Sequence, residues 1–341
     1  MVDDGNLQSA SYGLLNADEP AAILHALVEL KICDSSETIA NVSKAGEGNM
    51  NLVLRVTTDQ RSVIVKQARP WVEKYPSIAA PDERILSEIQ FYRSISNADQ
   101  VRAATPSVLA FDEEQRLLVL EDLGAASDYS MLYGSGIEQS EVDAAFGLAI
   151  DWVTQLHACD VKEDQNIGCV PLRTLNHQHI FSIPLLDTPA IDLDQVCTGL
   201  TNSSRALCSD ESVRQAMEQL GEIYIKGGGK LLHGDFYPGS WLATDAGFRV
   251  IDPEFCFFGP PEFDLGVLAA HWIFCGSAVD HSTIDRVCQA QGDNISNQLV
   301  AGFAGAELIR RLVGVAQLPL EAELKRRTNW LECGVSFLQK L

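Results

Sequence analysis

The sequence predicts an α+β protein built from a small β-rich part followed by a larger, mainly helical part. Strand-like runs with short turns between them cover residues 38–68, whereas from about residue 140 the apolar residues recur with helical spacing. We expect the boundary after the apolar run Leu117–Leu120, so that the two parts are residues 1–122 and 123–341. A chain of 341 residues is long enough for each part to bury its own core.

The composition excludes several classes of protein. The net charge is −22, from 25 Lys and Arg against 47 Asp and Glu, whereas binding to nucleic acid or anionic membranes needs clustered positive charge. No apolar run approaches the ~20 residues of a membrane span, and the first residues lack the pattern of a secretory signal. The nine cysteines form no CxxC pair. We therefore expect a cytoplasmic protein with reduced thiols that binds neither nucleic acid nor membrane.

The elements follow from local patterns. Pro20 opens a run with helical spacing, because proline fits the first turn of a helix. Residues 42–56 predict a hairpin around a glycine-rich turn, residues 62–66 a third strand, and residues 82–95 a helix. In the second part we expect a helix that is capped near Ser140 and runs to His157. Residues 231–266 follow, and then three further helical segments.

Two acidic turns within residues 231–266 carry the strongest functional signal. Each follows a short apolar run: His233-Gly234-Asp235 is the first turn, and Asp252-Pro253-Glu254 is the second. Their spacing suits a loop, a short hairpin and a second loop that folds back beside the first. In phosphoryl transfer one carboxylate orients the attacking hydroxyl, while another holds the Mg²⁺ that neutralises the phosphates. The two turns therefore predict phosphoryl transfer.

Asp235 is the candidate catalytic base, because a polar Ser240 follows its His-x-Asp loop at short range. Ser240 offers a hydroxyl to a metal or to the loop backbone, and His233 is expected to brace the loop through hydrogen bonds. A simple turn role for Asp235 is the structural alternative. Asp264 lies at the start of an apolar helix. We expect its carboxylate to stabilise the N-terminus of that helix or to brace the same loop.

Asp252 and Glu254 are the candidate metal ligands. They are separated by one residue after an apolar strand, so both project to one side if the chain stays extended. Hard cations prefer such oxygen ligands. The alternative is a strand-end turn stabilised by side-chain hydrogen bonds to the backbone.

The candidate phosphate-binding residues lie in the first part. Gly46 and Gly48, with Asn49, form a turn whose backbone N–H groups can approach phosphates, although hairpin glycines often serve only to allow positive φ. Lys66 ends an apolar strand, where its ammonium either reaches solvent or binds a phosphate. In the second case we expect a carboxylate from the next helix to hold the ammonium. We prefer Glu88 to Glu83, because Glu88 shares a helical side with apolar neighbours.

Together these motifs resemble the aminoglycoside phosphotransferase and choline kinase superfamily, whose members share the protein-kinase-like fold. The resemblance covers nearly the whole chain and is carried by residues 46–51, 64–68, 120–123, 233–240, 252–264 and 309–314. It implies a bilobal α+β fold, with an ATP-binding N-lobe over residues 1–122 and a helical C-lobe over residues 123–341.

Within the superfamily the chain resembles the methylthioribose kinases most. Ser240 stands where most of the superfamily has Asn, and Asp252-Pro253-Glu254 replaces the Asp-Phe-Gly of protein kinases. Arg310 and Arg311 resemble the twin arginine that lies near the transferred phosphate in that subgroup. One departure is Phe236-Tyr237-Pro238, where the subgroup usually has a Leu-His-Thr-like sequence. The resemblance implies that a hydroxyl of 5-methylthioribose or a related sugar accepts the phosphate of ATP.

The resemblance also implies a role for each candidate residue. The implied roles are Asp235 as base, Arg310 and Arg311 at the transferred phosphate, Gly46, Gly48, Asn49, Lys66 and Glu88 at the ATP phosphates, Glu121 to Leu123 as the adenine-facing hinge, and Asp252, Glu254 and Ser240 at Mg²⁺. Taken alone, two arginines on a helix are usually a solvated edge. Adjacent helical residues point about 100° apart, so we expect one arginine to reach the γ-phosphate and the other to brace the site.

Two other functions stay open. A kinase for a cationic acceptor, such as an aminoglycoside or choline, fits the acidic charge, with Trp241, Trp272 and Phe274 as candidates for a cation site. An inactive kinase-fold binding protein is the other, although such a protein has no physical need for the full set of site carboxylates and Lys66. The resemblance allows a homodimer.

Overall fold

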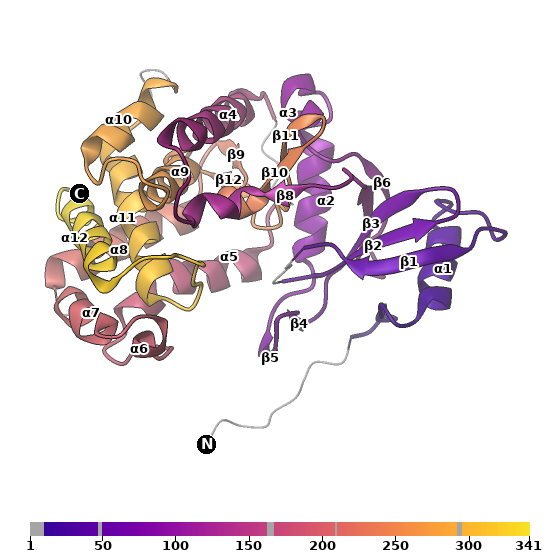
Figure 1. Ribbon diagram of the computed structural model, residues 1–341, viewed down its shortest axis with the longest axis horizontal. Helices are drawn as coiled ribbons and strands as arrows, with labels where there is room; N and C mark the ends of the chain where they lie inside the picture. The colour runs from indigo at the N-terminus through magenta and orange to yellow at the C-terminus, as the bar shows by residue number, and fades with distance from the viewer. Residues whose placement is uncertain (1–9, 47–49, 162–166, 209, 292–294) are drawn as a thin grey trace.

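The computed structural model describes residues 10–46, 50–161, 167–208, 210–291 and 295–341. Its architecture is α+β, as predicted, with an antiparallel sheet at one end of the molecule and a larger group of helices at the other (Figure 1). Helix α2 lies between the two ends (Figure 1). The exact boundary between residues 122 and 123 stays a prediction.

The first part contains the expected helix, hairpin and third strand. Its elements are α1 (Pro20–Glu29), β1 (Ile39–Lys44), β2 (Leu52–Thr58), β3 (Ser62–Gln67), β4 (Trp71–Val72), β5 (Tyr75–Ala79), α2 (Arg84–Ser94), α3 (Asp99–Ala103), β6 (Val108–Asp112) and β7 (Leu117–Glu121). Five strands pair antiparallel in the order β1-β2-β3-β7-β6. The hairpin β4–β5 is a separate two-stranded sheet.

The second part is mainly helical. Its elements are β8 (Ser127–Asp128), η1 (Tyr129–Tyr133), α4 (Gln139–Ala158), α5 (Val170–His177), η2 (Gln178–Ser182), η3 (Ile183–Leu185), α6 (Leu193–Val196), α7 (Leu200–Cys208), α8 (Glu211–Lys226), β9 (Lys230–Leu232), η4 (Pro238–Ser240), β10 (Trp241–Thr244), β11 (Gly247–Val250), β12 (Phe257–Gly259), α9 (Glu262–Phe274), α10 (His281–Gln289), α11 (Asn297–Val313) and α12 (Leu324–Leu338). The predicted cap near Ser140 is wrong, because α4 follows Glu138 and has no side-chain cap. Helices α10, α11 and α12 follow the acidic turns, as expected.

The five-stranded sheet is buried on both faces, which fixes the direction of Lys66. On β7, Leu117 and Val119 pack in a core shared with α1, whereas Leu118 and Leu120 belong to the core shared with α2 and the helical part. Successive side chains of a strand point to opposite faces. On β3, Val65 packs in the α1 core, so its neighbour Lys66 points towards α2.

Helices α9 and α11 form the centre of the helical part. Every residue of α9 is buried. A Cβ added at Gly266 would lie 2.5 Å from the Cβ of Phe303 and 2.9 Å from the backbone nitrogen of Ala304, so the two helices touch almost backbone to backbone. This close approach brings side chains of α9 and α11 into direct contact next to the acidic turns.

Two further expectations concern the molecule as a whole. Among the helices of the described ranges, none is both long and apolar enough to cross a membrane. The cysteines whose side chains are described are free thiols.

Replacing Gly266 with alanine tests the close approach of α9 and α11. Gly266→Ala should lower the free energy of unfolding by about 1–3 kcal/mol, because the extra methyl has no room. Gly147→Ala in α4 is the matched control, since nothing lies within 4 Å of its added Cβ. That change should be neutral or stabilise by about 0.5–1 kcal/mol, because alanine favours a helix. Urea unfolding measures both, and equal stabilities of the two variants would contradict the close packing.

Candidate active site

Lys66 joins three elements through buried charges. Its Nζ donates to both carboxylate oxygens of Glu88, at 2.8 and 2.6 Å, and to Oδ1 of Asp252. Lys66 and Glu88 are almost fully buried, whereas Glu83, the alternative partner, is exposed. The predicted pairing with Glu88 is therefore confirmed, and β3, α2 and the second acidic turn meet at one ammonium.

The charges of this cluster shift one another. Burial alone would lower the pKa of the Lys66 ammonium, but the charges of Asp252 and Glu88 outweigh it and raise the pKa above its ordinary value. Burial raises the pKa of Glu88 to about 6, although the charge of Lys66 opposes the rise. The ammonium therefore stays charged at neutral pH, as a phosphate-binding lysine must.

The loop that carries Asp235 is held in place by hydrogen bonds to α9 and through its own histidine. Asp264, in the first turn of α9, accepts hydrogen bonds from the backbone N–H of His233 at 2.8 Å and of Gly234 at 3.0 Å. The imidazole of His233 lies 3.0 Å from the carbonyl oxygen of Ile251, and burial lowers its pKa, so the neutral ring donates from Nε2. The bracing roles expected for His233 and Asp264 are confirmed.

The expectation that Asp252 and Glu254 project to one side assumed an extended chain, and this condition is not met. Asp252 has φ +69°, so the chain is not extended there and strand alternation does not apply. Asp252 faces Lys66, whereas Glu254 accepts a hydrogen bond from Nδ2 of Asn51 at 2.9 Å and lies 3.5 Å from Nε of Arg84. Burial and the charge of Asp252 raise the pKa of Glu254 to about 8.

Arg84 is the residue that holds the second turn from the first part, and the sequence reasoning missed it. It is fully buried, and its Nε donates to Oδ1 of Asn51 at 2.8 Å. Its two terminal nitrogens donate to backbone carbonyls, which belong to Met50, Arg69, Trp71 and Pro81. Arg84 thus ties the end of the glycine-rich turn to α2 and to Glu254. The available signal was an arginine directly before the apolar helix positions Ile85 and Leu86.

The side chains present can hold a magnesium ion in the manner that Mg²⁺ prefers. Mg²⁺ usually binds one or two carboxylates and keeps waters and substrate phosphates as its other ligands. Lys66 binds Oδ1 of Asp252, and 42% of the Asp252 side chain is exposed, so Oδ2 can receive a cation. Ser240 donates its hydroxyl to the carbonyl of Asp235 at 2.9 Å and keeps oxygen lone pairs. In the described ranges no three His, Cys, Asp or Glu residues cluster closely enough to hold a metal, which still leaves room for a site of this open kind.

The twin arginines lie beside Asp235. Nη2 of Arg311 donates to Oδ1 of Asp235 at 3.0 Å, and Nη2 of Arg310 lies 3.7 Å from the same oxygen. The side chains of Arg310 and Arg311 are 7% and 6% exposed, so the solvated-edge alternative is wrong. Glu307, which the sequence reasoning missed, accepts from Nη1 of Arg310 at 3.1 Å and from Nε of Arg311 at 2.6 Å. Its position three and four residues before the arginines was the signal.

The residues expected to face adenine lie where β7 ends. The carboxylate of Glu121 accepts a hydrogen bond from the backbone N–H of Ser107, and the chain continues through Leu123. Asp122, between Glu121 and Leu123 in the sequence, accepts hydrogen bonds from Nε and Nη2 of Arg55 at 2.9 and 3.0 Å. This ion pair fixes the connection between the two parts. The adenine-facing role stays a prediction.

The glycine-rich turn is described in part. Gly46 has φ +79°, which agrees with the alternative that a glycine stands there to allow a positive φ. Gly48 and Asn49 lie outside the described residues. The phosphate-binding role of all three stays a prediction.

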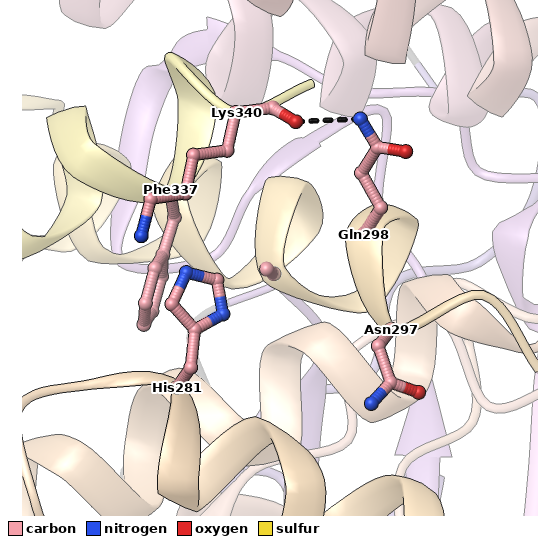
Figure 2. Close-up of a pocket in the computed structure, with 6 residues that line it drawn as sticks. His281, Asn297, Gln298, Phe337 and Lys340 are labelled. Atoms are coloured by element: carbon pink, nitrogen blue, oxygen red, sulfur yellow. Dashed lines mark hydrogen bonds between the residues drawn. The ribbon is translucent and has the colours of Figure 1, made fainter.

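Two other features do not belong to this site. A pocket between α10, α11 and α12 is lined by His281, Asn297, Gln298, Ala301, Phe337 and Lys340, none of which is a candidate site residue (Figure 2). The aromatic candidates for a cation site, Trp241, Trp272 and Phe274, are all buried in the core. They are therefore not available to a cationic acceptor.

Comparisons with known proteins agree with the fold. The profile of the phosphotransferase enzyme family matches residues 41–295. A methylthioribose kinase of Bacillus velezensis is 24% identical, over 97% of this chain and 94% of its own. A methylthioribose kinase of Exiguobacterium sibiricum is 24% identical, over 86% of this chain and 87% of its own. The crystal structure of LicA in complex with AMP superposes with a TM-score of 0.57 at 12% identity, over 94% of this chain and all of LicA.

Sequence and fold therefore make this protein a small-molecule kinase, an enzyme that moves a phosphoryl group to a hydroxyl. The chain belongs to the phosphotransferase enzyme family. The resemblance to the superfamily and the kinase-like α+β fold are confirmed.

Replacing Arg84 tests the link between the first part and Glu254. Arg84→Met should lower the free energy of unfolding by about 3–5 kcal/mol, because Asn51, Glu254 and four backbone carbonyls lose the donor that they share. Arg93→Met is the matched control on the same helix, since Arg93 forms an exposed ion pair and should cost at most about 1 kcal/mol. In a Glu254→Gln background the cost of Arg84→Met should shrink. An equal cost in both backgrounds, measured by urea unfolding, would contradict the link.

Proposed function

We propose that this protein transfers the γ-phosphate of ATP to a hydroxyl of 5-methylthioribose. The supporting observation is the joint presence of two clusters, Lys66–Glu88–Asp252 and Arg310–Arg311–Asp235, in a chain that aligns with the Bacillus velezensis methylthioribose kinase over 97% of its length. The first cluster supplies an ammonium for the donor phosphates and a free carboxylate oxygen for the metal ion that would accompany them. The second supplies the base and the charge for the transferred group.

The donor side of the site lies between the sheet and α2. In this proposal the ammonium of Lys66 binds ATP phosphate oxygens, and Glu88 keeps it in place. The backbone of the turn with Gly46, Gly48 and Asn49 covers the phosphates, while Glu121 to Leu123 face the adenine. A bound Mg²⁺, held by Asp252 with Ser240 or Glu254, would neutralise charge on the phosphates.

On the acceptor side Asp235 orients the attacking hydroxyl. The acceptor oxygen forms a bond to the γ-phosphorus, the bond from that phosphorus to the bridging oxygen breaks, and ADP leaves with the electron pair. The hydroxyl proton goes to Oδ2 of Asp235, because Oδ1 already accepts from Arg311. Arg310 is the better placed of the two to meet the phosphoryl oxygens, since Nη2 is too far from Asp235 for a hydrogen bond and its buried Nε has no partner in the described chain.

The remaining expectations are proposals of the same kind. Residues 1–122 act as the nucleotide lobe and residues 123–341 as the catalytic and acceptor lobe. The scattered free thiols support a cytoplasmic location. The homodimer stays a prediction.

An acceptor panel tests the proposed substrate. ADP release should require ATP, Mg²⁺ and 5-methylthioribose, and should be far slower with choline or an aminoglycoside, because the aromatic candidates for a cation site are buried. The measurement is a coupled ADP assay with the purified full chain, supported by thermal shift with a non-hydrolysable ATP analogue. ADP release with choline or an aminoglycoside but not with methylthioribose would overturn the proposed acceptor.

Asp235→Asn tests the base. The variant should lower kcat by about 10²–10⁴-fold with little change in the KM for ATP, because the amide keeps the shape but cannot take the proton. Asp245→Asn, an exposed residue in the turn between β10 and β11, is the control and should keep full activity. Undiminished kcat in Asp235→Asn would remove the assignment.

A further inference from the structure

We propose that Glu307, His271 and Tyr133 form a buried chain of positioning groups that holds the twin arginines against Asp235. The inference rests on the proposed role of Asp235 and the arginines, and it adds three residues that touch neither the nucleotide nor the acceptor in that proposal. The three come from separate elements: α11 carries Glu307, α9 carries His271, and η1 carries Tyr133.

The contacts form one unbroken path from Tyr133 to Asp235. The hydroxyl of Tyr133 lies 2.6 Å from Nδ1 of His271, and Nε2 of His271 lies 3.1 Å from Oε1 of Glu307. The same oxygen accepts from Nε of Arg311 at 2.6 Å, and Nη2 of Arg311 donates to Asp235 at 3.0 Å. Tyr133, His271 and Glu307 are 4%, 0% and 1% exposed, so water does not compete for these contacts.

The direction of each hydrogen bond follows from the carboxylate of Glu307. Burial alone would raise the pKa of Glu307, but the charges of Arg310 and Arg311 outweigh it and hold the pKa well below its ordinary value. Glu307 is therefore ionised and can only accept, so His271 donates from Nε2. Burial lowers the pKa of His271 to about 4, which keeps the ring neutral and makes Nδ1 an acceptor for the hydroxyl of Tyr133. Every donor on the path meets an acceptor.

Glu307 also balances the charge. Two guanidinium groups on adjacent residues are buried here, and buried charges persist only when they are paired. Asp235 and Glu307 supply two negative charges against the two positive ones. Without Glu307, both arginines would depend on Asp235 alone, and the carboxylate expected to take the substrate proton would be drawn into a tighter ion pair.

The geometry of Arg311 depends on this chain. Its Nε is fixed by Glu307, its Nη2 reaches Asp235, and its guanidinium lies 4.8 Å from the ring centroid of Tyr237. Glu307 is in turn fixed by His271, which cannot rotate away because Tyr133 holds its other nitrogen. A change of one hydroxyl at Tyr133 is therefore transmitted through His271 and Glu307 to the orientation of Arg311.

Two single variants and two matched controls test the chain. Glu307→Gln should lower kcat by about 10- to 100-fold with little change in the KM for ATP, because misplaced catalytic groups slow the step more than they weaken binding. Tyr133→Phe, which removes one hydroxyl, should lower kcat by a smaller factor. Tyr129→Phe in the same short helix and the exposed Glu332→Gln should leave kcat unchanged.

A double variant separates positioning from general stability. If Glu307 acts through Arg311, Glu307→Gln should cost much less kcat in an Arg311→Lys background than in the wild-type chain. Independent, multiplicative losses would overturn the proposal. Should Glu307→Gln fail to fold, Tyr133→Phe decides the matter alone, and wild-type kcat in that variant would overturn the proposal as well.

The test does not depend on the proposed acceptor. If 5-methylthioribose gives no ADP release with the wild-type protein, that acceptor is wrong, and the same variants are assayed with whichever member of the panel is active. Crystal structures of the wild-type protein and of Tyr133→Phe give a second readout without any acceptor. Movement of Arg311 away from Asp235 in the variant supports the chain, and an unchanged contact overturns it.

Discussion

The structure depends on one face of helix α2, whose side chains hold both carboxylates of the second acidic turn, one directly and one through Lys66. Arg84 and Glu88 lie four residues apart on this helix and so share a side. Glu88 binds Lys66, which binds Asp252, while Arg84 lies beside Glu254. All of these contacts except that of Asp252 are buried, and a buried charge that loses its partner is costly. The position of α2 therefore fixes where the sheet meets the acidic turns, and with it the geometry of the proposed donor site.

Helix α9 has the corresponding role on the other side of Asp235. Its first turn carries Asp264, which accepts two backbone hydrogen bonds from the His233-Gly234 loop. Its last turn carries His271, which meets Glu307 beneath the twin arginines. A single rigid helix thus positions the proposed base through its loop and through its arginine partner. The close contact of Gly266 with α11 fixes the position of α9 relative to α11. It thereby fixes Asp264 relative to the loop and His271 relative to Glu307.

The sequence predicted what local patterns determine and failed where a charged side chain depends on distant partners. The helix and strand periods placed α1, β3, α2 and β7 correctly, and helical spacing selected Glu88 over Glu83 for Lys66. The conformation of Asp252 was not predicted, because its φ is positive and its carboxylate binds Lys66, which lies 186 residues earlier in the chain. Arg84 was missed for the same reason, because its partners Asn51 and Glu254 lie far from it in the sequence. Glu307 was missed although its two arginine partners lie three and four residues further along the same helix.

Phe236-Tyr237-Pro238 differs from the usual sequence of the methylthioribose kinases. In this structure the first two of these residues pack in the core and against Arg311, and the proposed base lies outside the segment. Phe236 is fully buried and stacks on Trp152 with ring centroids 5.1 Å apart, so it belongs to the core beneath the loop. The ring centroid of Tyr237 lies 4.8 Å from the guanidinium of Arg311 and 5.2 Å from the ring centroid of His271. An aromatic face there stabilises a guanidinium that must stay in place while Asp235 works. In this chain a tyrosine thus adds a third contact to Arg311, alongside Glu307 and Asp235. The loop sequence can differ from the subgroup pattern while the proposed base and its arginine partner keep their geometry.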